Sequence, residues 1–352
     1  MTYAIDPDIT VAATLPGSFY SDIDTFARLK DRVFARTWQW LGTLDDVAAP
    51  ESLAPRTLLP GYLDEPLLLA RDADGVLRCM SNVCTHRGNL LVKAPCLASQ
   101  IRCGYHSRRF DLAGKMTFMP EFKEAKNFPA PSDDLPQLAF GEWAGQGFAA
   151  LEPAAPFEAF FADALASVAQ DPVAQLTHDA SRDREFIVQA NWALYVENYL
   201  EGFHIPFVHA GLNEVVDYAG YTSTLHRYSN LQQAWDKKGV LAARYWWVFP
   251  NLLLNYYPWG LSLNLVEPQA IDRSRVLFRS FVWDESKLGT GAGAGLDRVE
   301  AEDEAIVEAV QRGMRSRLYM RGRYSPTRER GVHHFHRLLC EFLGQALGPG
   351  NL

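Results

Sequence analysis

The sequence predicts an α+β protein in which a small all-β domain precedes a larger domain that combines helices with an antiparallel sheet. Three observations favour this fold class. The chain has 352 residues, 48% of them hydrophobic, which is enough for two separate cores. Short β-like runs, separated by Gly, Pro and Asp-Gly turn signals, fill residues 38–152. Helical spacing of apolar residues returns in residues 153–352, and these two ranges are the expected domains.

A helical segment is expected ahead of the all-β domain. Between residues 20 and 37, apolar side chains recur at helical spacing, namely Ile23, Phe26, Leu29, Val33 and Phe34. We expect residues 1–37 to form an N-terminal segment that packs on the second domain.

The second domain is expected to open with a helix in PFEAFFADALASVAQ and then to alternate helices and strands. Residues 241–268 predict paired strands with breaks at Pro250-Asn251 and Pro258-Trp259-Gly260. Helical spacing returns at about 296–318 and again at 333–347. The glycine-rich stretch GTGAGAG lacks the Lys-Ser/Thr of a phosphate-binding loop and is expected to be a flexible loop.

The most specific motif is C-x-H followed, sixteen residues later, by C-x-x-H, formed by Cys84, His86, Cys103 and His106. A Rieske [2Fe-2S] centre needs these ligands, because two cysteines hold one iron and two histidines hold the other. A structural zinc site is the alternative, but such sites usually pair Cys with Cys and His with His. The motif therefore predicts a Rieske cluster and electron transfer.

Charge and composition limit which partners and which cellular location are expected. The net charge of −8 and the pI near 5.6 argue against nucleic acid or an anionic membrane as a partner. The richest apolar stretch, 252–266, is short and interrupted by polar residues, so we expect no membrane span. Five cysteines without a secretory signal favour a reducing compartment, and the expected location is cytoplasmic.

A second metal site is indicated by the segment NWALYVENYLEGFHIPFVH, which contains His204 and His209. On an unbroken helix, residues five apart would diverge by about 140°. Pro206 lies between them and is expected to kink or end the helix, so both imidazoles can face one point. Two histidines and one carboxylate form the facial triad of non-haem Fe(II) oxygenases.

Periodicity nominates Asp303 as the carboxylate. The helix expected from Leu296 carries an apolar stripe of Leu296, Val299, Ile306, Val307, Val310 and Met314, and Asp303 falls in its middle. Its neighbours Glu302 and Glu304 are expected to point to the solvated flanks. An ionised carboxylate on a buried face needs a cation, which is either a nearby arginine or a metal ion.

Glu201 lies three residues before His204, which on a helix is the same face one turn earlier. An acid there can accept the other N–H of the ligand imidazole and so fix its tautomer. The alternatives are an outward-facing acid near an electron donor and a plain solvated helix acid.

The pairing of C-x-H…C-x-x-H with E-N-x5-H-x4-H resembles the α subunits of Rieske non-haem iron oxygenases over nearly the whole chain. The second motif is Glu197-Asn198, His204 and His209 here. The stretches YLEGFHIPFVH, FPNLLLNYYPWGLSLNLVEP and VEAVQRGMRSRLYMRGRYS are most similar to the choline monooxygenase-like branch, whose members oxidise quaternary ammonium compounds.

The resemblance implies a Rieske domain, a helix-grip (START-like) catalytic domain with mononuclear Fe(II), and a head-to-tail homotrimer. It also implies functional roles for Asn198 and Glu201, the latter linking His204 to His106 of a neighbouring subunit. The chain departs from the family pattern after His106, where a Trp is common and this sequence has Ser107-Arg108-Arg109-Phe110.

These features predict an oxidoreductase that hydroxylates or oxidatively N-demethylates a small organic substrate with O2. The chain has no flavin or nicotinamide module, so a separate NAD(P)H-dependent reductase is expected. An aromatic-ring hydroxylating dioxygenase is one alternative, and a Rieske electron carrier with a ligand-binding domain is another. Iron content separates the carrier from the oxygenase, at about two against about three Fe per chain.

A methylated amine is a possible substrate, because aromatic side chains can hold trimethylammonium by cation–π attraction. The candidates are Tyr195, Phe203, Tyr257 and Trp259, with Trp246, Trp247 and Tyr256 nearby in the sequence. Aromatic residues in strands are also ordinary core residues. Alternation puts Asn255 and Tyr257 on the strand face opposite Tyr256, without indicating which face lines a cavity.

Overall fold

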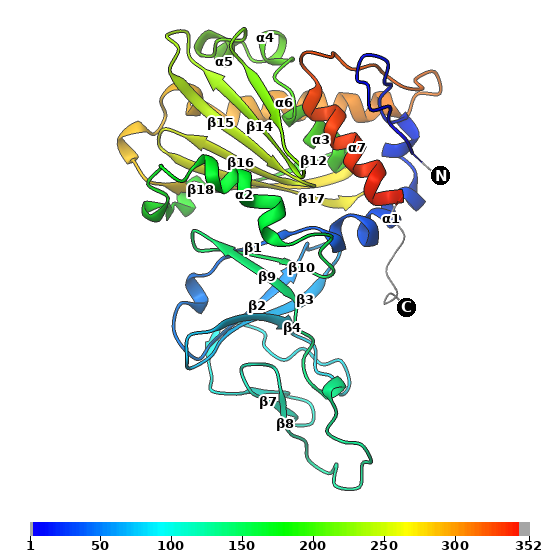
Figure 1. The fold of residues 1–352 in the computed structure, drawn as a ribbon, viewed down its shortest axis with the longest axis vertical. Coiled ribbons are helices and arrows are strands. Elements are labelled where there is room, and N and C mark those ends of the chain that lie inside the picture. Colours follow the sequence, from blue (N-terminus) through cyan, green and yellow to red (C-terminus); the bar gives the residue numbers. More distant parts are fainter. Residues whose placement is uncertain (1–2, 345–352) are drawn as a thin grey trace. The chain divides into compact units, whose positions relative to one another are not determined.

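The computed structural model describes residues 3–344 in two compact units (Figure 1). The first, here the β unit, spans Arg36–Ala154. The second, here the mixed unit, combines the chain up to Ala35 with the chain from Ala155 onward. The predicted α+β class is confirmed, since the β unit is built of strands with short 3-10 helices and no α-helix among its described residues, and the mixed unit joins helices to an antiparallel sheet.

The β unit consists of three small antiparallel sheets, with strand orders β1-β10-β9, β4-β3-β2-β5 and β6-β7-β8. Its strands are β1 (Gln39–Thr43), β2 (Ser52–Leu58), β3 (Glu65–Arg71), β4 (Leu77–Ser81), β5 (Cys96–Leu97), β6 (Ile101–Arg102), β7 (Arg109–Phe110), β8 (Met116–Phe118), β9 (Ala139–Trp143) and β10 (Gln146–Ala150).

Strand β3 explains how this unit is held together. Successive side chains of a strand point to opposite faces, so Leu68 and Ala70 enter one core while Leu67 and Leu69 enter the other. The first core also contains Cys84, Cys103 and Phe110. The loops that carry the predicted cluster ligands are therefore anchored on a strand whose central residues are buried.

The mixed unit is built on one eight-stranded antiparallel sheet of order β11-β18-β17-β16-β15-β14-β13, with β12 also paired to β18. Its strands are β11 (Thr177–His178), β12 (Arg184–Val188), β13 (Thr222–Leu225), β14 (Ser229–Trp235), β15 (Leu241–Val248), β16 (Leu252–Tyr257), β17 (Gly260–Ala270) and β18 (Arg273–Val282). The predicted breaks fall between β15 and β16 and between β16 and β17. Gly260 is required at the second break, because a Cβ there would lie 2.1 Å from the Phe281 carbonyl oxygen.

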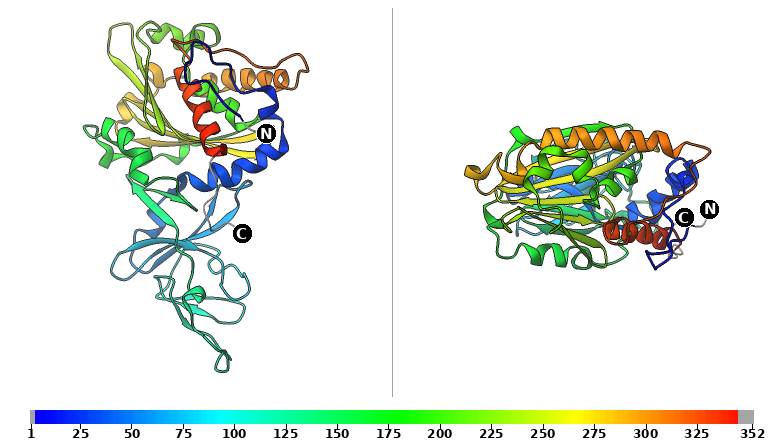
Figure 2. Two further views of the ribbon diagram at one scale, coloured as in Figure 1. Left: turned by 45° about the vertical axis from the view of Figure 1, so that its right-hand side comes forward. Right: turned by 90° about the horizontal axis from the view of Figure 1, so that it is seen from above.

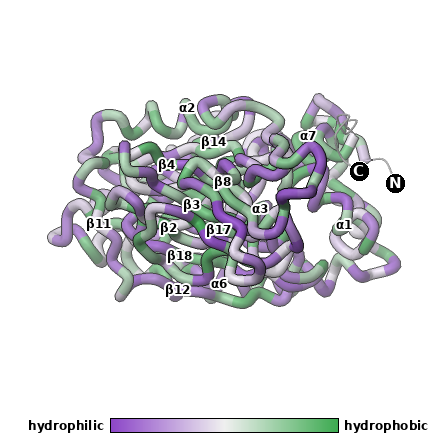
Figure 3. The backbone as a smooth tube through the Cα atoms, turned by 90° about the horizontal axis from the view of Figure 1, so that it is seen from below, coloured by the Kyte–Doolittle hydropathy of each residue, from purple (hydrophilic) through white to green (hydrophobic). Residues whose placement is uncertain are grey.

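Helices cover both faces of this sheet. The helices are α1 (Ile23–Arg32), α2 (Phe157–Ser167), α3 (Trp192–Tyr199), α4 (Ile205–Val208), α5 (Ala210–Val215), α6 (Leu296–Met314) and α7 (Arg330–Gly344). Trp246 points to α2, where its Nε1 donates to Ser167 Oγ, and Trp247 points the other way and packs on Phe335 of α7. Figures 2 and 3 show α2 and α6 on opposite sides of the sheet.

The N-terminal segment contacts the mixed unit. Tyr20, just before α1, donates a hydrogen bond of 2.7 Å to Glu197 of α3, and Arg28 donates to the Leu343 carbonyl of α7. The last helix ends at Gly344, and the remainder of the predicted helix 333–347 lies outside the described residues.

The buried face of α6 differs from the predicted stripe. Ile306 and Val310 are 41% and 38% exposed, whereas Glu300, Val307 and Gln311 are buried. Glu300 accepts from the Tyr195 hydroxyl and Gln311 accepts from the Asn191 amide, so specific partners stabilise polar groups at positions that hydrophobicity assigns to solvent. Asp303 nevertheless lies on the inward side, as expected.

Hydrophobic and hydrophilic positions alternate over short distances along most of the tube in Figure 3. Within residues 3–344, no helix has the length and apolar character needed to cross a membrane.

Candidate metal centres and substrate cavity

Two loops of the β unit bring the four predicted cluster ligands together. Cys84 and His86 follow β4, and Cys103 and His106 lie between β6 and β7. The two cysteines are buried in the same core cluster, and the centroids of the two imidazole rings are 4.7 Å apart. Paired sulfurs beside paired imidazoles are the donor set of a Rieske [2Fe-2S] cluster.

The surroundings of these four side chains fit such a cluster. His86 Nδ1 is buried and has no hydrogen-bond partner within the described part of the chain, as a metal-binding nitrogen would. The Tyr105 amide and Asn89 Nδ2 point at Cys103 Sγ, at 3.4 and 3.6 Å. Burial raises the pKa of the Cys103 thiol, but hydrogen bonds, led by the Tyr105 and His106 amides, outweigh it and lower that pKa. These donors favour the thiolate that binds iron.

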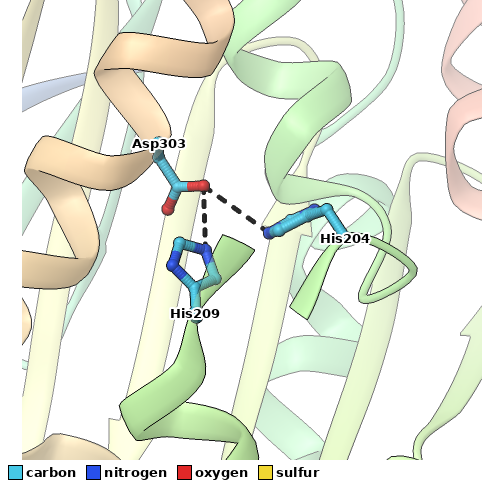
Figure 4. A group of neighbouring side chains, drawn as sticks. All are labelled: His204, His209 and Asp303. Atoms are coloured by element: carbon cyan, nitrogen blue, oxygen red, sulfur yellow. Dashed lines mark hydrogen bonds and ion pairs between the residues drawn. The ribbon is translucent and has the colours of Figure 1, made fainter. Parts of the chain in front are cut away.

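The three predicted ligands of the second site converge inside the mixed unit (Figure 4). Asp303 Oδ1 lies 3.1 Å from His209 Nε2 and 3.5 Å from His204 Nε2. Metal–nitrogen bonds of about 2.1 Å place neighbouring donor atoms about 3 Å apart, so these atoms can close on one ion. Two imidazoles and one carboxylate are the donors of a non-haem Fe(II) site, and the residues fit a ferrous ion.

The backbone that presents the histidines differs from the prediction. Helix α3 ends at Tyr199, so neither Glu201 nor His204 is on it, and Pro206 does not kink a continuous helix. Pro206 instead lies in the first turn of α4, where a helix has no partner for the missing N–H. The non-helical turn after α3, rather than a kink, directs His204 toward His209.

Each histidine is hydrogen-bonded to a carboxylate through Nδ1, the ring nitrogen that does not face Asp303. Glu201 Oε1 lies 2.6 Å from His204 Nδ1, and Glu302 Oε2 lies 2.8 Å from His209 Nδ1. Each carboxylate keeps the Nδ1 proton in place and leaves Nε2 free to bind metal. Burial lowers the pKa of His209, but Asp303 and then Glu302 outweigh burial and raise it.

The prediction that Glu302 is a solvated acid on the flank of the helix is wrong, because its carboxylate contacts His209. Helix geometry could not reveal this role, because His209 is 93 residues away in the sequence. The contact of Glu201 with His204, by contrast, is found where the spacing predicted it, although the local structure is a turn rather than a helix.

A cavity opens beside the three ligands, between the sheet and helices α3 to α6. Glu201, His204, His209 and Asp303 form part of its wall, as does Asn198. The other side chains that give it character are aromatic, acidic or amide-bearing, namely Tyr195, Tyr199, Tyr221, Tyr245, Asn255, Tyr257, Ser262, Asn264 and Glu300. Asn255 and Tyr257 settle the face of β16 that alternation left open.

Only two of the four predicted substrate residues line this cavity. Tyr195 and Tyr257 do, whereas Phe203 is 41% exposed and Trp259 is buried behind Tyr257, with ring centroids 5.3 Å apart. The assignments of Phe203 and Trp259 are thereby corrected. Phe203 lies on the outer side of the turn that carries His204, and Trp259 lies in the tight turn that ends β16.

Three cavity tyrosines, Tyr199, Tyr221 and Tyr245, were missed. Of the three, Tyr199 has a local signal in the sequence, because it immediately follows the Glu197-Asn198 pair of the second motif. Tyr245 reaches the cavity through the pairing of β15 with β14 and β16, and Tyr221 lies in the loop immediately before β13.

Glu300 is a further cavity residue that the sequence did not reveal. Both of its carboxyl oxygens accept from the Tyr195 hydroxyl, at 2.8 and 2.7 Å. Burial raises the pKa of Glu300 to about 8. The cavity therefore contains a carboxyl group that changes charge near neutral pH, one turn of helix before Asp303.

Comparison with known families matches both units. The family model "Rieske [2Fe-2S] domain" matches residues 37–129. The family model "Ring hydroxylating alpha subunit (catalytic domain)" matches residues 171–236 and 217–345. The two matches cover the cluster loops and the triad.

Similar proteins extend over almost the full chain. A chloroplastic choline monooxygenase of Arabidopsis thaliana is 29% identical over 95% of this chain and 84% of its own length. A carnitine monooxygenase oxygenase subunit of Escherichia coli K12 is 28% identical over 94% of each chain.

Solved structures share the fold. The quaternary ammonium Rieske monooxygenase CntA in complex with L-carnitine superposes with a TM-score of 0.77, at 25% identity over 95% of this chain and 97% of that one. A naphthalene 1,2-dioxygenase with bound indole gives a TM-score of 0.71 over 95% and 92% of the two chains, at 16% identity.

Proposed function

The chain belongs to the α subunits of Rieske non-haem iron oxygenases, and from this premise we propose that it oxidises a methylated ammonium cation. It is an oxidoreductase whose reaction is hydroxylation or oxidative N-demethylation. When bound, the mononuclear Fe(II) supplies O2 activation and the Rieske cluster supplies electrons.

The chemistry of the cavity wall supports a cationic substrate. Tyrosine rings attract ammonium groups through their π faces, and the acids Glu201 and Asp303 add negative charge, to which Glu300 contributes only as the pH rises toward its raised pKa of about 8. Among the described residues that line the cavity, none is Lys or Arg. A neutral arene would gain nothing from these acids and would leave their charge uncompensated.

The residues around the triad have separate tasks in this proposal. Glu201 and Glu302 fix the orientation of His204 and His209 through Nδ1. The cavity walls position the substrate and exclude bulk water, which strengthens electrostatic attraction at the site.

Two alternatives are less well supported. An electron carrier with a ligand-binding domain would not need the triad, and the chain matches the catalytic domain of oxygenases. An arene dioxygenase shares the fold, but the likeness to the naphthalene enzyme is limited to fold.

Oxygenases of this family receive electrons from a reductase and pass them between subunits. We propose an NAD(P)H-dependent reductase and a head-to-tail homotrimer in which Glu201 of one subunit faces His106 of the next. Exposed aromatic side chains near both metal sites support such contacts between subunits. Phe203 and Phe207, near the triad, are 41% and 79% exposed, and Tyr105, beside His106, is 64% exposed. The division into domains at 38–152 and 153–352, and the cytosolic location, stay predictions.

Tetramethylammonium is expected to raise the melting temperature of the iron-loaded protein, because a ligand that binds the native state stabilises it. Choline added to dithionite-reduced protein is expected to give an oxidised product on exposure to O2, and naphthalene is expected to give none. Mass spectrometry of the products and thermal scans test this. Formation of a naphthalene diol without any shift from ammonium compounds would contradict the proposed function.

A further inference from the structure

Four tyrosines form an aromatic box in the cavity beside the triad. Tyr199 and Tyr245 meet edge to face with centroids 6.4 Å apart, and Tyr245 and Tyr257 do so at 6.0 Å. Tyr221 closes the group and packs against Gly202, where a Cβ would lie 2.8 Å from its ring. Burial raises the pKa of all four hydroxyls, so they stay neutral, and all four side chains line the cavity, where tyrosine rings can attract a cation.

A neutral polar patch lies on the strands beneath this box. Asn255 and Ser262 are directly paired across β16 and β17, and Asn264 is on the same face. Asn255 Oδ1 accepts from the Tyr199 hydroxyl and Asn264 Oδ1 accepts from Ser262 Oγ, each at 2.7 Å. Each amide oxygen thus already accepts one hydrogen bond, and the amino groups of both Asn side chains are the donors that a ligand can use.

The described part of the cavity wall carries acidic side chains but neither Lys nor Arg. Its carboxyl groups are Glu201, Glu300 and Asp303, and the described lining residues include no Lys or Arg that could pair with an anionic ligand group. Removing a carboxylate from water without a cationic partner is costly, whereas a hydroxyl needs only the neutral donors and acceptors present here.

We propose that this cavity selects methylated ammonium cations whose arm ends in a neutral hydroxyl, and that it discriminates against betaines, in which the same cation carries a carboxylate. This inference rests on the proposed function and narrows its substrate class. The aromatic box holds the cation, and the Asn255–Ser262–Asn264 patch holds the hydroxyl.

Three matched ligands test separately what the cation and the hydroxyl of the substrate contribute to binding. Choline and glycine betaine share the trimethylammonium group and differ in hydroxyl against carboxylate. 3,3-Dimethyl-1-butanol has the shape and hydroxyl of choline without its charge. Titration calorimetry on iron-loaded protein without O2 is expected to show choline binding about tenfold or more tightly than either, from the cost of an unpaired carboxylate and the loss of cation–π attraction.

A pair of variants tests the box. Tyr245→Phe keeps the ring and is expected to retain choline binding, whereas Tyr245→Leu removes the π face and is expected to weaken it several-fold with little effect on 3,3-dimethyl-1-butanol. Equal or tighter binding of glycine betaine overturns the inference. If tetramethylammonium still binds in that case, the proposed function stands and only the selectivity fails; if no ammonium compound binds, the proposed function fails as well.

A second and independent observation concerns Arg108, which occupies the segment where the sequence departs from its family after His106. Its side chain is buried, at 1% exposed. One guanidinium nitrogen donates to Thr85 Oγ1 at 2.6 Å and the other to Asp133 Oδ1 at 2.7 Å. Thr85 lies between Cys84 and His86 and itself donates to the Asp133 carbonyl. Arg108 thus ties the second ligand loop to the first.

We infer that Arg108 is a positioning residue that also raises the reduction potential of the cluster. A guanidinium carries a permanent charge, and a buried positive charge favours the reduced cluster, which holds one more electron. Asp133 offsets part of that charge, so its removal should act in the opposite direction to removal of Arg108.

Redox titration of the holoprotein, followed by electron paramagnetic resonance, tests this inference. Arg108→Met is expected to lower the midpoint potential, Arg108→Lys to keep most of it, and Asp133→Asn to raise it. Arg78→Gln, which removes a partly exposed cation paired with Asp72, is the control and is expected to change nothing. If Arg108→Met fails to hold a cluster, Asp133→Asn decides alone; no upward shift there, or equal shifts in the Met and Lys variants, overturns the inference.

Discussion

Asp303→Ala is expected to abolish substrate oxidation while leaving the visible spectrum of the Rieske cluster unchanged. Asp303 supplies the only carboxylate oxygen of the three-atom group that His204 and His209 complete, and its Oδ1 lies within 3.5 Å of both Nε2 atoms. Its loss removes one of three protein ligands and leaves the two imidazoles, which still contact Glu201 and Glu302 through Nδ1. The four cluster ligands belong to the β unit and are untouched. Metal analysis is expected to fall from about three to about two Fe per chain.

Two control variants make this test specific. Asp297→Ala removes an exposed acid from the same helix, where Asp297 pairs with Arg184, and should leave iron content and activity unchanged. Cys84→Ser should show the opposite pattern to Asp303→Ala, with loss of the cluster spectrum. Retained activity in Asp303→Ala, or a bleached cluster in that variant, would show that the ligands are assigned incorrectly.

Glu201→Gln is expected to retain both metal centres and nearly stop electron transfer between them. The substitution keeps the shape and one oxygen beside His204, so iron binding should persist. The lost charge matters if Glu201 also faces the partner subunit's His106, as proposed for the trimer. Single-turnover oxidation of the reduced cluster, with substrate and O2 present, measures this step directly.

Glu302→Gln is the matched control, because Glu302 supports His209 Nδ1 in the same way as Glu201 supports His204 Nδ1. If both acids only orient imidazoles, both variants should lose activity similarly, by about ten- to a hundredfold. If Glu201 also bridges subunits, only Glu201→Gln should leave the cluster reduced. Equal rates of cluster oxidation in the two variants would remove the bridging role.

Mixed trimers provide a second measurement of the same route. A His106→Ala chain lacks a working cluster and a His204→Ala chain lacks a working iron site. Activity should return in verified mixed trimers, because a working cluster can then face a working iron site across a subunit boundary. Absence of recovery would exclude the intersubunit path.

The sequence by itself predicts the two ligand sets, and the structure brings the members of each set together. Short spacings such as C-x-H and C-x-x-H keep their meaning in any fold, since ligands two or three residues apart remain neighbours on one loop. The contact between Glu201 and His204 was predictable for the same reason. Even where the turn replaced the expected helix, a separation of three residues kept the two side chains within reach.

Helix α6 shows where such local rules stop. Periodicity placed Asp303 on the inward side, but it assigned Ile306 and Val310 to the core and Glu302 to solvent. The burial of Glu300 and Gln311, and the contact of Glu302 with His209, depend on partners about 90 to 120 residues away along the chain. Hydrophobicity does not encode whether a polar group will find its hydrogen-bond partner.

The cavity was decided by the tertiary structure alone. Alternation along β16 divides Asn255 and Tyr257 from Tyr256, but only the placement of α3 and α6 over one face of the sheet makes the first pair cavity residues. Strand pairing brings Tyr245 of β15 to this cavity, and Tyr221 reaches it from the loop before β13, although neither has a local signal in the sequence. Ligands within one short motif, such as Cys84 and His86 or His204 and His209, are indicated by local spacing, and Asp303 by the periodicity of its own helix, whereas a binding cavity is assembled by long-range packing. For this reason the sequence indicated the metal ligands and left the cavity open.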